Sequence, residues 1–392
     1  MRQSAARAEG TGMSFDLAQL RSEWDLDWSQ HHVNHGSFGA TPRVGLHALE
    51  HWRAQAQRNP NSFYRWELMP AIAQARSRIA TFLGLAAEDA ALVRNSTEAS
   101  NIVLRGMRLA PGDEVVVFEQ EYGAVTLAAK RAAALAGAHV VEIPAPLDFT
   151  DGMLLGAFAS ALTEHTRLLV VDQITSMTAR VMPVVELSRM CREQGVAIAV
   201  DASHAPGTID VDFVGLDADF WFGNLHKWAC APVATGALVI AARRRDEHPS
   251  LVTSWFDLEP YPLAFDMLGT LDYAPWLATP AVLDFIEAIG WQRWRAACIE
   301  RTAFGRNLLR QALGLAEDDS ALQVPMALVP LGVRGGPALA NEMCQSLGVR
   351  YAVQAAVTTY RDELFVRVSG QVYNDEDDYY ALAAAVRDLL GK

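Results

Sequence analysis

The sequence has no apolar run of the about 18 residues that a membrane-spanning helix needs, although 51% of its 392 residues are hydrophobic. It is also short of positive charge, with 33 Lys and Arg residues against 46 Asp and Glu residues and a formal net charge of −13. Nucleic acids and anionic membrane surfaces are polyanions that need a basic patch, so both are disfavoured as partners. We expect a soluble globular protein that acts on a small molecule.

The sequence also has few cysteines and few apolar residues near its N-terminus, and both features help to predict the cellular compartment of the protein. The four cysteines lie far apart and form no CxxC pair: Cys191, Cys230, Cys298 and Cys344. We expect free, mostly buried thiols and no bound metal. The first residues, MRQSAARAEGTGMSF, lack the apolar stretch of a secretory signal, which predicts a frayed arm on a cytoplasmic protein.

Short apolar runs with helix-like stretches between them predict a layered α/β domain. Runs that are apolar on both faces, such as 168–171 and 196–200, suit central strands covered by helices on each side. Seven runs predict one large, doubly wound, mainly parallel seven-stranded sheet. They are Ala91–Arg94, Glu114–Phe118, His139–Ile143, Arg167–Val171, Val196–Val200, Ala218–Phe222 and Gly236–Ala241.

The pattern changes beyond about residue 245, where a Pro- and aromatic-rich connection leads into a long amphipathic stretch, Thr279–Leu313. After it, three runs read as strands and one as a closing helix: 323–332, 348–360, 363–370 and Glu376–Leu390. Together they predict a smaller C-terminal α+β domain. The expected division is an N-terminal arm associated with the small domain, a large domain, and a small domain with its linking helix: 1–30, 31–265 and 266–392.

Two charged residues follow predicted strands, at the carboxyl ends where open α/β sheets bind their ligands. Asp201 either caps a helix or is a carboxylate paired with the protonated ring nitrogen of pyridoxal 5′-phosphate (PLP), which acts as an electron sink. Lys227 is either an exposed loop residue or, because lysine is rarely buried without a function, an amine that forms a Schiff base.

A third segment, 94–101 (RNSTEASN), runs from a strand end into a helix. Its backbone N–H groups and hydroxyls can cradle a phosphate, although an ordinary capping box has a similar pattern. Because the three features lie on strand ends of one predicted sheet, they support one another and indicate a PLP site.

Taken with these features, several short motifs resemble those of fold-type-I PLP enzymes of the class V aminotransferase group, in the isopenicillin N epimerase-like branch. The resemblance covers nearly the whole chain and implies an aspartate-aminotransferase-like fold. The motifs are VNHGSFG from Val33, NSTEASN, EYGA, DQITS, DASHAPG, GNLHKW, GTLD, RVS from Arg367, and Tyr373-Asn374.

The resemblance also implies roles for individual residues. Lys227 would hold the cofactor and move protons at the substrate Cα, Asp201 would pair with the ring nitrogen, His204 would lie near the ring hydroxyl, and Tyr122 would stack on the ring. The phosphate would be held by Ser96, Thr97, Asn224 and His226, and by Thr270 from a second subunit. The last of these implies a homodimer with shared active sites.

Arg367 matches the arginine that binds the substrate α-carboxylate in the family, a task that suits a planar guanidinium; a solvated strand residue is the alternative reading. Asn34, His35 and Ser176 would border the same pocket. Aromatic residues crowd nearby segments, either as packing or as room for a bulky substrate: Phe63, Tyr64, Trp66, Tyr122, Trp255, Phe256, Tyr273 and Trp276.

The resemblance leaves the fate of the deprotonated substrate open. We rank β-elimination first, as a C–S lyase acting on an L-cysteine S-conjugate in sulfur metabolism or antibiotic biosynthesis. Epimerisation ranks second, followed by transamination or oxidative decarboxylation. Residues 350–355 contain no cysteine where cysteine desulfurases carry their nucleophile, which argues against persulfide chemistry. A non-catalytic PLP-fold binding protein would not need Lys227, Asp201 and Arg367 together.

Overall fold

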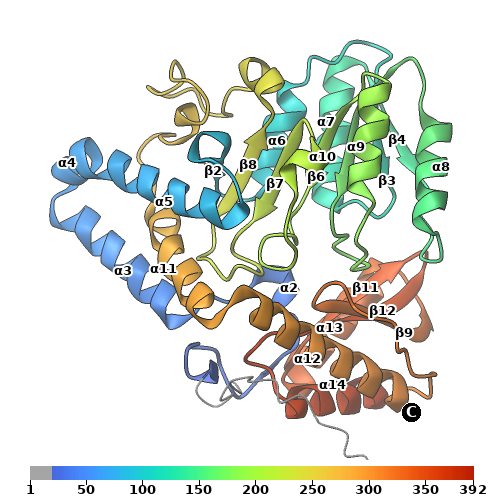
Figure 1. The fold of residues 1–392 in the computed structure, drawn as a ribbon. Coiled ribbons are helices and arrows are strands. Elements are labelled where there is room, and N and C mark those ends of the chain that lie inside the picture. Colours follow the sequence, from blue (N-terminus) through green and yellow to red (C-terminus); the bar gives the residue numbers. More distant parts are fainter. Residues whose placement is uncertain (1–19) are drawn as a thin grey trace, which may run out of the picture.

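The computed structural model describes residues 20–392, so the predicted frayed segment, residues 1–15, lies outside the described residues. Figure 1 shows a central sheet flanked by helices above a smaller group of strands and helices near the C-terminus. We call these the large lobe (residues 43–248) and the small lobe (residues 291–392). Within the described residues, no helix is both long and apolar enough to cross a bilayer.

The large lobe is built on seven strands in the order β2-β8-β7-β6-β5-β3-β4. Neighbours from β7 to β4 are parallel, whereas β8 runs antiparallel to both β2 and β7. All seven predicted runs form strands, with bounds within two residues of those expected. The strands are β2 (Ala91–Val93), β3 (Glu114–Phe118), β4 (His139–Ile143), β5 (Thr166–Asp172), β6 (Ala197–Asp201), β7 (Phe220–Asn224) and β8 (Gly236–Ile240).

Helices cover both faces of this sheet, as the fully apolar strands predict. Val116 and Leu169 face one core with α5, α8 and α9, whereas Val115 and Leu168 face another with α6 and α7. The large-lobe helices are α3 (Arg43–Arg58), α4 (Pro60–Ser62), α5 (Leu68–Leu83), α6 (Ser96–Gly106), α7 (Gly123–Ala136), α8 (Asp151–Ala161), α9 (Val184–Glu193) and α10 (Phe213–Leu216). Shorter turns are η1 (Phe63–Glu67), η2 (Ala87–Asp89), η3 (Ala242–Glu247) and, past the lobe, η4 (Leu263–Phe265).

The small lobe has an antiparallel sheet in the order β11-β12-β9. One predicted strand, 348–360, is partly wrong: its first residues end helix α13, because Ala340, Met343 and Leu347 are buried at helical spacing. The elements are α12 (Trp291–Ala312), β9 (Met326–Arg334), α13 (Pro337–Tyr351), β10 (Val353–Gln354), β11 (Ala356–Tyr360), β12 (Glu363–Ser369) and α14 (Glu376–Leu389).

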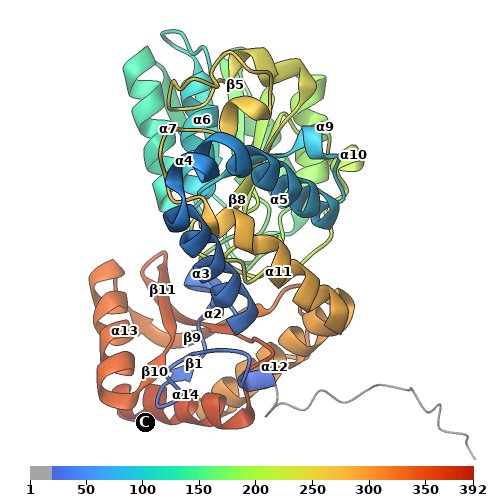
Figure 2. The same cartoon turned by 90° about the vertical axis from the view of Figure 1, so that its left-hand side faces the viewer.

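The connection between the lobes consists of two helices. The predicted amphipathic stretch divides at Gly290, whose φ of 101° ends α11 (Ala274–Ile289) before α12 begins. Helix α11 packs against α3 and α5, as both views show (Figure 2). Near the start of the described chain, Trp24 packs on Trp294 and Tyr373 with ring centroids 5.9 and 5.3 Å away. The exact domain boundaries stay a prediction.

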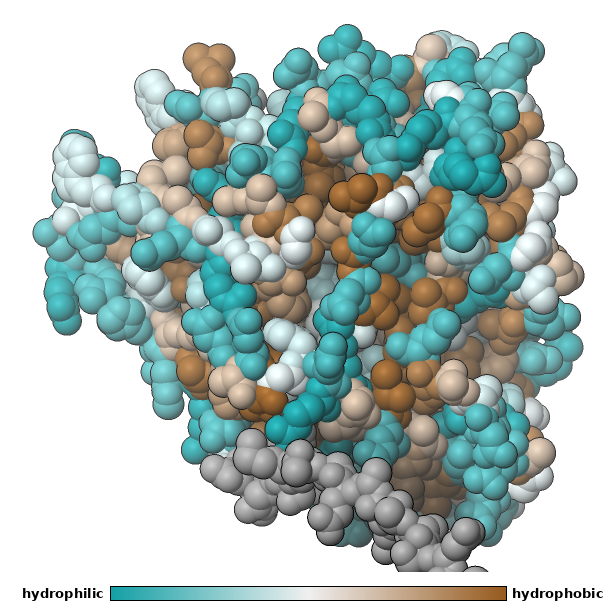
Figure 3. Space-filling view, in the orientation of Figure 1, coloured by the Kyte–Doolittle hydropathy of each residue, from teal (hydrophilic) through white to brown (hydrophobic). Residues whose placement is uncertain are grey.

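Polar and apolar groups are distributed as the composition suggests. The outer surface in Figure 3 is mostly hydrophilic, with hydrophobic side chains gathered toward the middle of this face. All four cysteines are free, and three of them are buried, so the expectation of unpaired thiols is confirmed.

Candidate active site

The residues singled out in the sequence meet at one edge of the large-lobe sheet. Asp201 ends β6, Asn224 ends β7 and Lys227 follows three residues later, while Ser96 begins α6 directly after β2. From the small lobe, Arg367 on β12 donates a hydrogen bond to the backbone oxygen of Ser176. The candidate site therefore lies where the two lobes meet, at the carboxyl ends of the strands.

Asp201 is fully buried and caps no helix, since the next helix, α10, is capped by Asp212. Its Oδ1 accepts hydrogen bonds from the backbone N–H and the hydroxyl of Ser203, at 2.8 and 2.5 Å. Its Oδ2 is buried and has no hydrogen-bond partner. Burial raises the pKa of Asp201, while the Ser203 bonds and the charge of Lys227 oppose that rise. The helix-cap reading is thus wrong, and one carboxylate oxygen remains free.

Lys227 lies beside a histidine whose tautomer is fixed by its neighbour. The indole Nε1–H of Trp228 donates to Nδ1 of His204 at 3.1 Å, and Nε2 of His204 lies 3.1 Å from Nζ of Lys227. Burial lowers the pKa of His204 well below its usual value, so the ring is neutral. Because Nδ1 accepts, its proton is on Nε2 and points at Nζ.

The amine of Lys227 can accept this hydrogen bond only in its uncharged form. Burial and the nearby charge of Arg367 lower the pKa of Lys227 to about 8, despite the opposing carboxylates of Asp201 and Asp172. A neutral amine is the nucleophilic form that condenses with an aldehyde.

The start of α6 carries a cap and free hydroxyls together. Asn95 accepts the backbone N–H of Glu98 at 2.9 Å, and the backbone N–H of Ser96 donates to the side-chain oxygen of Asn224, also at 2.9 Å. The hydroxyl of Ser96 is buried without a partner, and Thr97 is exposed. The cap is thus provided by Asn95 rather than by Ser96 or Thr97, and both hydroxyls are available to an anion.

His226 and Thr235 lie on the other side of this helix start. His226 is half-buried, and its Nδ1 lies 3.2 Å from the backbone oxygen of Thr235. Burial lowers the pKa of His226, and the hydroxyl of Thr235 is buried without a partner. An anion bound at Nε2 of His226 would require the ring to take up a second proton.

Arg367 is a buried cation without a carboxylate partner in the part of the chain that the structure describes. Its guanidinium donates to the backbone oxygen of Ser176, to Oδ1 of Asn34 at 3.1 Å and to Oγ of Ser37 at 2.8 Å. Its Nε has no partner, and burial lowers its pKa to about 10. A buried charge of this kind is expected to receive an anion, so the alternative of a solvated strand arginine is wrong.

His35 lies behind Lys227 rather than in an open space. It is buried, with Nδ1 2.9 Å from the hydroxyl of Tyr373 and Nε2 3.0 Å from both the backbone oxygen of Lys227 and Nε2 of Gln371. Burial lowers the pKa of His35 to about 4. Its contacts support the Lys227 backbone, which differs from the substrate contact predicted for it.

Two predicted residues are more loosely placed. Tyr122 precedes α7 and is 45% exposed. Thr270 is exposed in the connection between the lobes, and within residues 20–392 it makes no hydrogen bond to the other predicted site residues.

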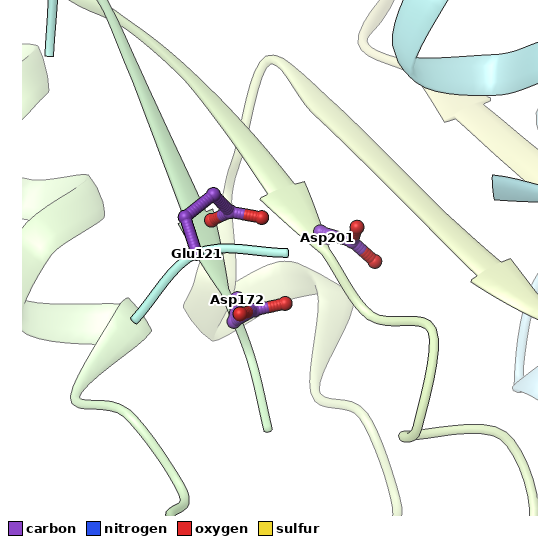
Figure 4. A group of neighbouring side chains, drawn as sticks. All are labelled: Glu121, Asp172 and Asp201. Atoms are coloured by element: carbon purple, nitrogen blue, oxygen red, sulfur yellow. The ribbon is translucent and has the colours of Figure 1, made fainter. Parts of the chain in front are cut away.

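Sequence reasoning missed several neighbours of these residues. Glu121 and Asp172 each place a carboxylate oxygen within 4.8 Å of one on Asp201 (Figure 4). Trp228 and Ser203, which orient His204 and Asp201, were quoted in motifs but given no role. The available signal for Asp172 was its position directly after an apolar strand, the same pattern that identified Asp201.

Comparisons with known proteins agree with this geometry. Residues 43–315 match the family profile described as aminotransferase class-V. The chain is 29% identical to isopenicillin N epimerase of Streptomyces clavuligerus, over 96% of this chain and 99% of that protein. It is 30% identical to putative L-cysteine desulfhydrase 1 of Oryza sativa subsp. japonica, over 95% and 86%. The solved complex of the cystine C–S lyase C-DES with cysteine persulfide has a TM-score of 0.77, with 23% identity and coverage of 92% and 97%.

The cofactor of this family is PLP, and the residues present fit it. Asp201 has a free buried oxygen for the ring nitrogen, and Ser96 and Thr235 have free buried hydroxyls near a helix start for the phosphate. Lys227 offers the aldehyde an amine whose pKa is lowered to about 8, chiefly by burial. The ring nitrogen, the phosphate and the aldehyde of PLP thus each meet a group of matching chemistry.

Proposed function

Because this chain belongs to the aminotransferase class-V family, whose members are PLP-dependent enzymes, we propose that it is a C–S β-lyase that releases a thiol from an L-cysteine S-conjugate. The proposal includes the residue roles that the resemblance implies. Lys227 would hold PLP, Asp201 would pair with its ring nitrogen, and Arg367 would bind the α-carboxylate of the substrate.

The observation that carries the choice of β-elimination is that His35 and His204 have both ring nitrogens engaged, while the third histidine near Lys227, His226, is assigned to the phosphate. His204 lies between Trp228 and Lys227, and His35 lies between Tyr373 and the Lys227 backbone. Neither is free to deliver a proton to the second face of a substrate. Epimerisation needs such a second group, whereas β-elimination needs one base and a leaving group.

When bound, PLP withdraws electrons from the Cα of the amino acid attached to it and so acidifies the Cα proton. Arg367 holds the α-carboxylate with its two-pronged guanidinium. Lys227 takes the Cα proton, the electron pair left at Cα forms a double bond to Cβ, and the Cβ–S bond breaks to release a thiolate. Lys227 then returns its proton to the thiolate. The 2-aminoacrylate that is left takes up one water molecule to give pyruvate and ammonia, which balances the reaction.

The position of Cys344 also supports this assignment. Its Sγ accepts the backbone N–H of Val357 at 3.1 Å, between α13 and β11. The thiol is therefore tied into the small-lobe core rather than placed on a loop. A nucleophilic thiol needs an exposed, electropositive setting, so the persulfide route of desulfurases is disfavoured.

Epimerisation is the second candidate, and the hydroxyl of Tyr122 favours it. This side chain is 45% exposed at the start of α7, on a segment that also contains Glu121. If the hydroxyl faces the bound substrate opposite Lys227, it is the one group in place to protonate the second face.

The deciding experiment incubates the protein with a panel of L-cysteine S-conjugates and follows pyruvate, ammonia, free thiol and chirality together. We expect the first three products in equal amounts and no D-isomer. Tyr122→Phe serves as the matched variant: it should keep β-elimination, because Lys227 is the base, but would abolish epimerisation. Accumulation of the D-amino acid with solvent deuterium at Cα, and without pyruvate, would replace the lyase assignment by the epimerase.

We also propose a homodimer with shared active sites. Large apolar side chains stand exposed on the described chain, with Phe38 78%, Trp66 72% and Trp255 99% exposed, whereas Tyr273 and Trp276 are buried in the core. Contact with a second copy would cover such side chains. Sedimentation at assay concentration tests the dimer. Mixing Lys227→Ala with a PLP-weak Thr270 variant, each inactive alone, should restore some activity if sites are shared.

A further inference from the structure

Three carboxyl groups converge at the ends of three neighbouring strands. Glu121 follows β3, Asp172 ends β5 and Asp201 ends β6, and the order β3-β5-β6 makes these strands adjacent. Each residue offers an oxygen within 4.8 Å of the others. In Figure 4 the side chains of Glu121 and Asp172 point toward the side of Asp201.

This carboxyl cluster (Glu121, Asp172 and Asp201) is almost without compensating charge. The three residues are 4%, 3% and 0% exposed, and Glu121 Oε2, Asp172 Oδ2 and Asp201 Oδ2 are buried without hydrogen-bond partners. Within residues 20–392, Lys227 in its protonated form is the cation that faces Asp172 and Asp201, and it forms no ion pair with either. Three ionised carboxylates cannot persist at this spacing in a buried site.

The titratable groups behind Lys227 do not change this balance. They are His204 and His226, whose pKa values burial lowers, and Arg367, whose charge acts on Lys227 and His204. Neutral histidines add no positive charge to the cluster. The cluster must therefore reduce its own charge by retaining protons.

Hydrogen bonding determines which member of the cluster stays ionised. Asp201 Oδ1 accepts two bonds from Ser203, at 2.8 and 2.5 Å, and bonds to the charged form favour it. Glu121 Oε1 accepts the backbone N–H of Tyr122 at 3.1 Å. Backbone N–H groups, of Tyr122 and Asp172 for Glu121 and of Tyr122 for Asp172, lower the pKa of each carboxyl, but within the described residues neither has a side-chain donor such as Ser203 provides for Asp201. Burial first, then the neighbouring carboxyls, raise the pKa values of Glu121 and Asp172 well above their usual range.

We propose that Glu121 and Asp172 share one proton and act, as a carboxylic acid–carboxylate pair, to position Asp201 and the backbone of Tyr122 around the cofactor ring. The inference rests on the proposed pairing of Asp201 with the ring nitrogen. The shared proton turns two repelling carboxylates into a hydrogen-bonded pair. Both residues are positioning residues, because they act through Asp201 and Tyr122.

The first test measures thermal unfolding of the holoenzyme between pH 5 and pH 9 in Glu121→Gln and Asp172→Asn. The pKa values of Glu121 and Asp172 are higher in the folded protein than in the unfolded chain. The wild type therefore loses stability as the pH rises from 5 to 9. Neutral amides cannot ionise. Relative to the wild type, each variant should gain about 2 to 4 °C in Tm between pH 5 and pH 9.

Glu119→Gln is the matched control, two residues before Glu121. Burial alone would raise the pKa of Glu119, but hydrogen bonds from Tyr360, the Ala145 backbone and Arg361 lower that pKa overall. The stability that ionised Glu119 contributes is lost only as the pH falls below the pKa of this residue in the unfolded chain. The Tm difference between this variant and the wild type should therefore stay constant from pH 6 to pH 9.

The second test records the infrared spectrum of the holoenzyme at pH 7. The carbonyl band of a protonated carboxylic acid should be present in the wild type and in Glu119→Gln, and lost in the double variant Glu121→Gln with Asp172→Asn. Absence of the band from the wild type would overturn the shared proton, even if the variants fail to fold. If the band is present but Asp201→Asn turns over normally, the proposed role of Asp201 fails while the proton pair stands.

Discussion

The anionic and cationic sides of the site are built differently. The carboxyl cluster comes from neighbouring strands of one sheet, so the strand register alone brings its members together. The cations come from both lobes: Lys227 follows β7, and Arg367 lies on β12. Burial lowers the pKa of Lys227 to about 8 and that of Arg367 to about 10. The anionic side is therefore fixed by the large lobe, whereas the cationic side depends on how the lobes meet.

Removing the amine from the cationic side should have the largest effect. We expect Lys227→Ala to lose activity by more than about a thousandfold, because it loses both the cofactor linkage and the base. The wild type should be yellow, and borohydride should attach the cofactor to Lys227, as mass spectrometry of the peptide would report. Lys130→Ala, which removes an exposed lysine paired with Glu142, is the control. A colourless wild type that takes up no PLP on titration would contradict the assignment.

On the anionic side, Asp201→Asn should retain the cofactor and lose most of its turnover. A neutral amide cannot keep the ring nitrogen protonated, and one charge-assisted contact of this kind contributes about 3 kcal/mol, or roughly a hundredfold in rate. Steady-state kinetics with the cofactor absorbance measured in parallel separates loss of rate from loss of PLP. Near-normal turnover would show that Asp201 does not serve the nitrogen.

Arg367→Lys tests whether the small lobe supplies the carboxylate site. Lysine keeps the charge but cannot form a two-pronged contact, so KM for the amino acid should rise about tenfold with a smaller change in kcat. Arg361→Lys, on the same hairpin but bound to Glu119, should leave both constants unchanged. An unaltered KM in Arg367→Lys would place the carboxylate elsewhere.

Local sequence patterns were enough to predict most of the large lobe. The strands Glu114–Phe118 and His139–Ile143 match their predicted bounds, because each is a short run of β-branched residues between turns or helices. Asp201 and Lys227 were predicted for a similar reason, since each follows a short apolar run. The segment up to Tyr351 was misread because an apolar run cannot by itself distinguish a helix end from a strand.

Contacts that depend on the order of strands or on the second lobe could not be predicted in this way. Glu121 and Asp172 meet only because β3 and β5 are neighbours, although β4 lies between them in the sequence. His35 reaches the backbone of Lys227 across 192 positions of the sequence, and no periodicity encodes that distance. The motifs contained these residues, but only the assembled sheet shows which of them touch.

The smallest predicted effect concerns Trp228, which fixes the tautomer of His204 and so the charge of Lys227. Without the indole donor in Trp228→Phe, Nδ1 of His204 can carry the proton, Nε2 can accept, and Lys227 can stay protonated. With a pKa of about 8, roughly one lysine in ten is neutral at pH 7. A rise of half a unit in the pKa of Lys227 would slow imine formation at that pH by about threefold.

The test follows the rate of reconstitution of the apoenzyme with PLP by absorbance from pH 6 to pH 10. In Trp228→Phe the midpoint of this pH profile should shift upward. Trp221→Phe removes another buried indole, one that donates to Gln173 at 3.0 Å, and its midpoint should not move. Equal shifts in the two variants would mean that loss of packing, rather than the hydrogen bond to His204, sets the charge of Lys227.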